Sequence, residues 1–179
     1  RIVQECGVGL VPIERGAGGV LAFQAPPCAT RALDPALLPL LQAALGGELA
    51  AGGTVADMGI RWLCVPLTSA AACLAVRADI AALTPLLAAA GADGLALYGT
   101  HGAGGPADYE VRALLSEHGA LVEDPVTGSA NACIAHLLAG ADYTVRQGTC
   151  LQRDGRVSVT FRDGQAWIGG ACLTVIAGT

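Results

Sequence analysis

The chain has 179 residues, of which 53% are hydrophobic, 14% charged and only 4% aromatic. This length and composition predict a sizeable domain with an aliphatic core and argue against intrinsic disorder. The formal net charge of −5 leaves no basic surface for phosphates, so nucleic acid is not expected as a partner.

Membrane insertion and export are not expected either. The most apolar stretch, residues 80–98, is interrupted by Pro85 and Asp93 and falls short of the roughly 20 apolar residues that span a bilayer. No basic-then-apolar leader opens the sequence. The seven cysteines include no C-x-x-C pair and most stand in apolar runs, so we expect free, buried thiols and no metal site. A reduced, cytoplasmic protein fits these features.

The first part of the chain predicts a hairpin and a helix. Residues 8–14 and 19–25 have strand-like sequences, and the glycines between them suit a tight turn. Residues 25–33 read as a connector. Asp34 followed by Pro35 is a helix-start signal, and the helix is expected to run to about Leu45 and to stop at Gly46-Gly47.

The middle of the chain predicts alternating short strands and helices. Residues 54–67 suggest extended structure that enters a buried strand, and a short helix is expected over 69–76. Asp79 is the expected cap of an Ala- and Leu-rich helix that ends near Gly91. Residues 94–99 and 109–115 then predict strands on either side of a glycine-rich loop.

The last part of the chain predicts a helix over 130–138 and then strands alone. Residues 155–162 alternate apolar and polar side chains, and residues 165–178 are expected to return as the partner strand. Strands outnumber helices and the last hairpin implies antiparallel pairing. The fold class is therefore α+β, with helices packed against a mostly antiparallel, strongly curved sheet.

The polar chemistry of the chain is concentrated in EDPVTGSAN, residues 123–131. Pro125 pushes Asp124 toward extended backbone, and Gly128 permits angles closed to other residues. Ser129 falls where a helix N-cap belongs, and the free amides after it form a pocket for a carboxylate or phosphate. Asp124 would stand at its rim as an acceptor or general base. The alternative is a structural cap, in which Asp124 and Ser129 satisfy the helix amides without a ligand.

This run also resembles a known family. EDPVTGSANACIAHLLAG, residues 123–140, closely resembles the signature of the phenazine-biosynthesis isomerase-like (PhzF-like) family. QGTCLQRDGRVSVTF and WIGGACLTVIAGT resemble its closing strands, and MGIRWLCVPLTSAAACLAVRADIAAL resembles its strand–helix unit upstream. The resemblance implies a fold like that of diaminopimelate epimerase, with two similar halves, each a central helix wrapped in a curved sheet.

The resemblance also implies an activity and a set of site residues. Family members are isomerases or epimerase relatives that act on small, carboxylate-bearing metabolites without a cofactor. Asp124 matches the active-site aspartate of this half, and Gly128 and Ser129 match the turn residues that bind the substrate's polar groups. Thr127 and Asn131 are expected to shape the substrate pocket rather than to react.

The match covers roughly the last three-fifths of a typical member. Residues 1–27 are therefore expected to be a remnant hairpin of the N-terminal domain, and residues 28–179 the C-terminal domain. The family's proton-moving glutamate and its companion histidine lie in the first half, and neither Glu5 nor Glu14 stands in that glutamate's context. We expect little activity from this chain alone, and either a homodimer or association with a missing N-terminal segment. The other hypothesis is a non-catalytic binding or dimerising module that keeps the carboxylate pocket.

Two further runs bear on the resemblance. ERGAGGVLAF, residues 14–23, resembles the motif before a catalytic cysteine of diaminopimelate epimerases, but Phe23 stands where the thiol would be, so we interpret the run as a turn. Family members often have Arg-x-Phe-x-Pro ahead of the signature, whereas here Leu114 and Ser116 follow Arg112.

The remaining thiol and imidazole candidates have plainer interpretations. Cys133 stands one helical turn beyond Ser129 and is expected in the core. His136 lies two turns along the same helix and is expected to be structural or partly exposed. His101 and His118 stand in loop-like segments, where solvated surface histidines are expected.

Overall fold

The computed structural model describes residues 2–46 and 49–178. Its strands are β1 (Ile2–Cys6), β2 (Gly9–Arg15), β3 (Leu21–Gln24), β4 (Ala29–Ala32), β5 (Thr54–Asp57), β6 (Arg61–Pro66), β7 (Gly94–Thr100), β8 (Tyr109–Glu117), β9 (Ala120–Asp124), β10 (Tyr143–Gln147), β11 (Gly155–Arg162) and β12 (Gln165–Gly170). The α-helices are α1 (Leu38–Leu45), α2 (Ala70–Ala75), α3 (Ile80–Ala90) and α4 (Gly128–Leu137), and short 3-10 turns are η1 (Ala17–Gly19), η2 (Pro35–Leu37) and η3 (Thr149–Leu151).

All strands belong to one strongly curved sheet. Their order is β1-β2-β3-β12-β11-β10-β8-β7-β6-β5-β4, and β9 pairs with β8 beside that path. The pairs β6–β7 and β8–β10 are parallel, and the other neighbours are antiparallel. The expected class, α+β with a mostly antiparallel sheet around a central helix, is confirmed.

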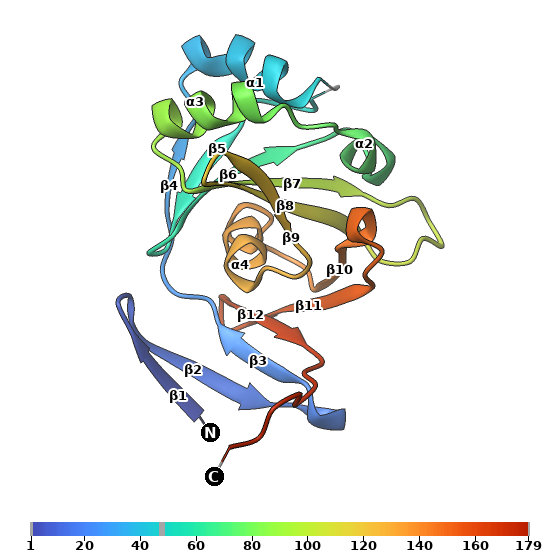
Figure 1. Ribbon diagram of the computed structural model, residues 1–179. Coiled ribbons are helices and arrows are strands. Elements are labelled where there is room, and N and C mark those ends of the chain that lie inside the picture. Colours follow the sequence, from blue (N-terminus) through green and yellow to red (C-terminus); the bar gives the residue numbers. More distant parts are fainter. Residues whose placement is uncertain (1, 47–48, 179) are drawn as a thin grey trace.

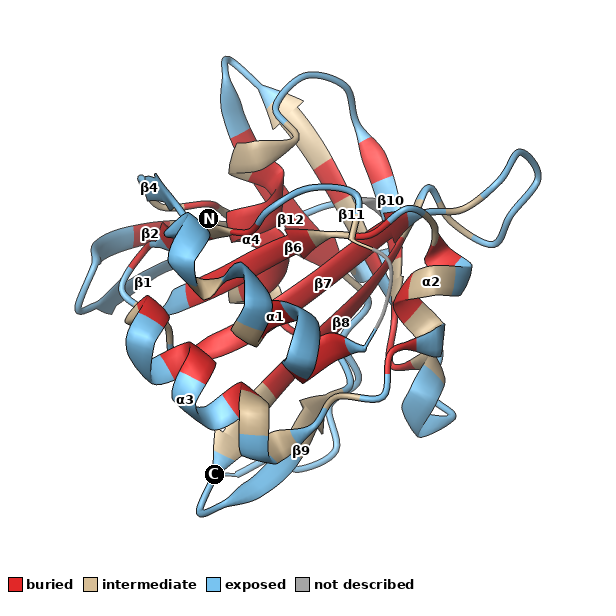
Figure 2. Cartoon of the chain, turned by 90° about the horizontal axis from the view of Figure 1, so that it is seen from above, coloured by how far each residue is buried: buried red, intermediate tan, exposed pale blue. Residues whose placement is uncertain are grey.

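The sheet separates two apolar cores. Its inner face wraps around α4, which stands at the centre of the curve (Figure 1). On the outer face α1 and α3 lie across β6, β7 and β8, whose residues are mostly buried beneath them (Figure 2). Alternating side chains of one strand serve both cores: on β8, Val111 and Ala113 pack toward α4, whereas Leu114 packs toward α1 and α3.

Several local predictions are confirmed, and their caps explain them. Asp79 accepts a hydrogen bond from the Ala81 amide at 2.9 Å and starts α3 as expected. Asp34 accepts one from the Ala36 amide at 2.9 Å and caps η2, the 3-10 turn that leads directly into α1. Gly46 ends α1 and Gly91 ends α3 in left-handed backbone. Gly47, the other residue of the expected stop, lies outside the described residues.

Other local predictions need correction. The expected connector over 25–33 contains β4, and the segment 54–67 forms two strands, β5 and β6, rather than one. The last strand ends at Gly170, and the apolar residues 171–178 that follow are not part of the sheet. Apolar sequence favoured a strand there, but no neighbouring strand pairs with that segment in the described part of the chain.

The N-terminal hairpin is continuous with the rest of the sheet. The pairing of β2 with β3 is antiparallel as predicted, and β1 extends it on the far side. β3 also pairs with β12, with Trp167 opposite Gln24 and Gly170 opposite Leu21. The proposed boundary between residues 27 and 28 therefore lies just after β3, which is hydrogen-bonded to β12 of the C-terminal hairpin. No helix in the described residues is long and apolar enough to cross a membrane.

Candidate active site

The turn between β9 and α4 carries the residues predicted for the site. β9 ends at Asp124, Pro125 and Val126 are exposed, and α4 begins at Gly128. The N-cap is Thr127, not Ser129 as predicted, and the helix begins two residues earlier than expected. Thr127 has extended backbone angles, and the Asn131 amide already donates to its carbonyl at 3.2 Å.

No side chain of the described residues caps the start of α4, so Asp124 and Ser129 do not satisfy the helix amides as the structural-cap alternative predicted. The Asp124 carboxylate accepts from the Thr127 hydroxyl at 2.7 Å instead of from a helix amide. Among the hydrogen bonds of the described residues, none uses the amide N–H of Gly128, Ser129 or Ala130. These three donors, at the positive end of the helix, therefore stay available for an anionic group.

Gln147 is a buried residue of the site that the sequence reasoning missed. Its side chain is fully buried at the end of β10. Its Oε1 accepts from the Thr127 amide at 3.2 Å and from Asn131 Nδ2 at 2.9 Å, and its Nε2 donates to the Asp124 carbonyl at 3.0 Å and to Thr127 Oγ1 at 2.9 Å. Asn131 Nδ2 also donates to the Thr127 carbonyl at 2.9 Å. One amide side chain therefore links the turn to the first turn of the helix.

Ser129 is held from the inner face of the sheet. The indole N–H of Trp62, on β6, donates to Ser129 Oγ at 3.1 Å, and Trp62 is 1% exposed. Because an indole N–H can only donate, the Ser129 oxygen is the acceptor and its own proton is free to point elsewhere. A second position, Gly94 on β7, permits this packing, because a β-carbon there would meet the six-membered ring of Trp62.

A buried ion pair anchors the residue before Asp124. Arg112 on β8 donates from Nε and Nη2 to the two carboxylate oxygens of Glu123 at 3.0 and 2.9 Å. Its Nη1 donates to the carbonyls of Cys73 and Val76, at the end of α2. Burial by itself would lower the pKa of Arg112, but its hydrogen bonds with Glu123 outweigh that effect and the pKa is raised. The guanidinium therefore stays charged and ties β9 to α2.

Two cavities lie in front of the start of α4. One, of about 360 Å³, has Gly128 and Ser129 on one wall and mainly apolar side chains opposite: Gln4, Cys6, Val8, Val11, Ile13, Phe23, Pro26, Met58 and Ile60. The other, of about 500 Å³, shares Ile13, Phe23 and Gly128 with it and extends along β12. Thr127 and Asn131 are buried behind the turn, and the half-buried Asp124 does not line either cavity.

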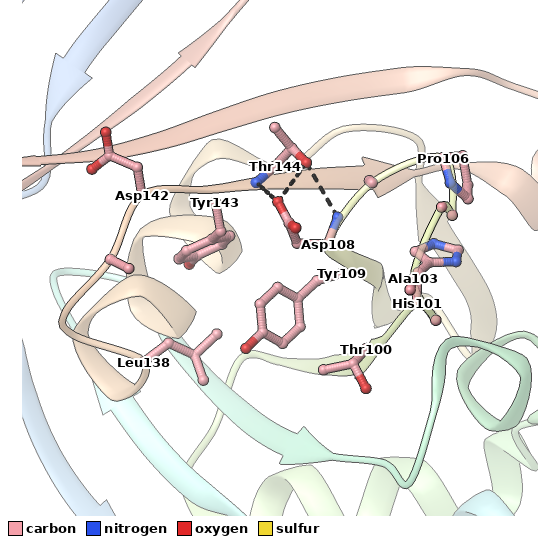
Figure 3. Close-up of a pocket in the computed structure, with 15 residues that line it drawn as sticks. Thr100, His101, Ala103, Pro106, Asp108, Tyr109, Leu138, Asp142, Tyr143 and Thr144 are labelled. Carbon is pink, nitrogen blue, oxygen red and sulfur yellow. Dashed lines mark hydrogen bonds between the residues drawn. The ribbon is translucent and has the colours of Figure 1, made fainter.

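A larger cavity lies elsewhere. It has a volume of about 610 Å³ and lies between the glycine-rich loop after β7 and the segment that follows α4. Figure 3 shows Tyr109 and Tyr143 side by side in it, and Thr144 bound to Asp108. Of the candidate site residues weighed from the sequence, only His101 lines this cavity, and of the signature run 123–140 only Leu138 does.

Among the residues that the structure describes, Cys133, His136 and His101 make contacts within the fold, whereas His118 does not. Cys133 is fully buried and His136 hydrogen-bonds the Pro26 carbonyl at 2.9 Å, as expected for both. His101 is not a solvated surface residue: its Nε2 lies 3.1 Å from Glu110 Oε2, and Glu110 is fully buried. His118 is exposed at the β8–β9 turn. Within residues 2–46 and 49–178, no group of three or more His, Cys, Asp or Glu side chains could hold a metal ion.

The curved sheet around one central helix, with a Gly-Ser turn at the helix start, defines the class of diaminopimelate epimerase-like folds. Residues 1–178 match the family model described as phenazine biosynthesis-like protein, PhzC-PhzF. The chain therefore belongs to the PhzF family. A search of the curated proteins gave no match.

Solved structures support the fold. A PhzF-family phenazine biosynthesis protein of Bacillus anthracis superposes with a TM-score of 0.74 at 18% identity, covering 94% of this chain and 64% of that one. The Enterococcus faecalis family member gives 0.68 at 18% identity, with 94% and 60% covered. A predicted epimerase of Pseudomonas aeruginosa gives 0.66 at 22%, with 90% and 58% covered. The chain thus spans less than two thirds of the length of these relatives.

Proposed function

We propose that this chain forms the carboxylate-binding part of an isomerase or epimerase that moves a proton on a small, carboxylate-bearing metabolite. The observation that carries the proposal is at the start of α4. The amides of Gly128 and Ser129 have no acceptor among the described residues, and both residues line a cavity of about 360 Å³. A substrate carboxylate would accept from these amides and from the Ser129 hydroxyl, whose proton Trp62 leaves free.

The other predicted site residues have supporting roles in this proposal. Asp124 does not line the cavity itself, so it would accept a hydrogen bond from a polar group at the edge of the bound substrate, and so would polarise that group or act as a base. Thr127 and Asn131 would hold the turn in shape from behind, because the Thr127 hydroxyl donates to Asp124 and the Asn131 amide nitrogen donates to Gln147. The substrate would need an apolar body, because the wall opposite Ser129 is mainly apolar.

The proton-moving group would come from another segment. Glu and His side chains do not line the cavity at Gly128 and Ser129 within the described residues. Relatives of known structure are also longer than this chain. We propose that the catalytic form contains a further segment of the family fold, in the same or another polypeptide, and that the purified 179-residue chain has little or no turnover.

Amide chemical shifts test the carboxylate site directly. Titration of the ¹⁵N-labelled chain with acetate, propionate and butyrate should shift the Gly128 and Ser129 amides in a saturable way. The start of α3 is an internal control, because Asp79 already caps it and its Ala81 amide should not respond. Chloride at equal ionic strength controls for non-specific screening. Unchanged Gly128 and Ser129 shifts at saturating acid would refute the site.

A second candidate is a non-catalytic binding or dimerising module. It is favoured by exposed apolar side chains on the N-terminal hairpin and the C-terminal segment: Ile2, Val3, Val8, Leu10, Leu173, Val175 and Ile176. Association that covers such a surface is expected to be concentration-dependent. Sedimentation velocity of the chain separates the two candidates when it is combined with the acid titrations: a stable homodimer that binds acids supports the module, whereas an acid-binding monomer supports a part that needs a further segment.

A further inference from the structure

We propose that Gln147 is a positioning residue: through Thr127 it holds the Asp124 carboxylate by Oδ2 in one orientation, and Oδ1 is thereby left in a fixed place to accept a hydrogen bond from the ligand. The inference rests on the proposed function, and it adds a residue and an atom-level role to it.

Backbone groups determine the orientation of the Gln147 side-chain amide, that is, which of its two terminal atoms is the oxygen and which is the nitrogen. The Thr127 amide can only donate, so the atom of Gln147 that faces it must be the oxygen. The Asp124 carbonyl can only accept, so the atom that faces it must be the nitrogen. Asn131 agrees with this orientation, because its Nδ2 bridges the Thr127 carbonyl and Gln147 Oε1, which both accept. A rotation of either amide by 180° would place like groups against each other.

The orientation of Gln147 then fixes the Thr127 hydroxyl. Gln147 Nε2 donates to Thr127 Oγ1 at 2.9 Å, so this oxygen already accepts. Its single proton is left for Asp124 Oδ2, which is 2.7 Å away. Asp124 Oδ2 is thereby occupied as an acceptor. Oδ1 accepts no hydrogen bond from the described residues, and it is not one of the buried unpartnered atoms. It is the carboxylate oxygen that remains for a ligand.

Burial makes this orientation costly to reverse. Gln147 and Asn131 are fully buried and Thr127 is 6% exposed, so water does not compete for these groups. Every donor and acceptor of the Gln147 side chain is used. The strand register supplies the position, because β10 runs parallel to β8 with Gln147 opposite Val111, beside the strand that pairs with β9.

The experiment compares matched acids in matched variants. The probes are glycolate with acetate, and 3-hydroxypropionate with propionate, and binding is read from the Gly128 and Ser129 amides of the whole chain. If Asp124 Oδ1 accepts the ligand hydroxyl, the hydroxy acid of at least one pair binds tighter, by roughly threefold to tenfold. Thr127→Ser keeps the hydroxyl and should keep this ratio. Thr127→Val and Gln147→Met release Asp124 Oδ2, so the carboxylate is no longer held in one orientation, and they should bring the ratio close to one.

Thr144→Val is the control variant. Thr144 Oγ1 donates to Asp108 Oδ2 at 2.7 Å, the same kind of bond at the same distance, but in the cavity away from the signature turn. Its removal should leave the ratio unchanged. A ratio near one in the unmodified chain, or a ratio that survives Thr127→Val, overturns the inference. If no acid shifts the amides in any variant, the proposed function fails instead. If Gln147→Met does not fold, the binding ratio measured in Thr127→Val decides whether the inference stands.

Discussion

The indole nitrogen of Trp62 and the hydroxyl oxygen of Ser129 are 3.1 Å apart, although 67 residues separate them in the chain. This bond links β6 to the first turn of α4 through the core. Trp62→Phe should destabilise the chain by about 1–3 kcal/mol, through lost indole volume and an unpaired Ser129. A double-mutant cycle with Ser129→Ala, read by urea unfolding, should give a coupling of about 1 kcal/mol. Trp167→Phe is the control, and a zero coupling for Trp62 would contradict the bond.

The buried pair of Arg112 and Glu123 should be far more important for stability than a surface pair. Arg112→Met would leave a buried carboxylate without its partner and should cost roughly 3–5 kcal/mol. Arg61→Met breaks the exposed pair with Asp93, in which the side chains are 47% and 40% exposed, and should cost under about 1 kcal/mol. Chemical denaturation of both variants tests the ranking, and equal losses would refute it.

Gly155 should be intolerant of a side chain. A β-carbon there would lie 2.8 Å from the Gln147 carbonyl oxygen and 3.0 Å from the Pro125 carbonyl oxygen. Gly155→Ala should therefore cost about 1–3 kcal/mol and displace the turn that precedes α4. Gly102→Ala is its control, because no atom lies within 4 Å of the β-carbon position. Melting temperatures and the Gly128 amide shift report the two effects separately.

Local signals explain which parts of this fold could be predicted from the sequence. The caps Asp34 and Asp79 act on amides two residues away, so the helix starts they predict are confirmed. Ser129 looked equally suitable as a cap, but Thr127 takes the N-cap position, because the start of α4 is set by Gln147, 20 residues further along the chain. The turn residues were found by their family signature, whereas Gln147 and Trp62 depend on strand register and gave no local signal.

The stability of the chain should fall in acid partly through Asp108. Its hydrogen bonds from the Thr144 side chain and backbone lower the pKa of Asp108 below its ordinary value of 3.8. A lowered folded-state pKa means that the stabilisation is present above the unfolded pKa and is lost as the pH falls through the folded one. Asp108→Asn should therefore flatten the decline of melting temperature below about pH 4. An unchanged acid slope would contradict this role.

The cysteines should react in two classes. Burial raises the pKa of Cys64 and of Cys73 to about 12, and it also raises that of Cys133. Iodoacetamide near pH 8 should label the exposed thiols of Cys6 and Cys172 quickly, and the three buried thiols only after unfolding. Peptide mass spectrometry over time checks the order, and early labelling of Cys64 would show that the inner core opens.

The pairing of β3 with β12 constrains the order in which the protein can fold. Residues 21–24 leave the ribosome long before their neighbours in the sheet, residues 167–170, are made. Until then the exposed edge of β3 has no partner on that side, and the apolar wall that faces Gly128 cannot close. Such long-range closure slows folding. A ribosome stalled before residue 165 should therefore carry a chain whose N-terminal hairpin is open to proteases and chaperones.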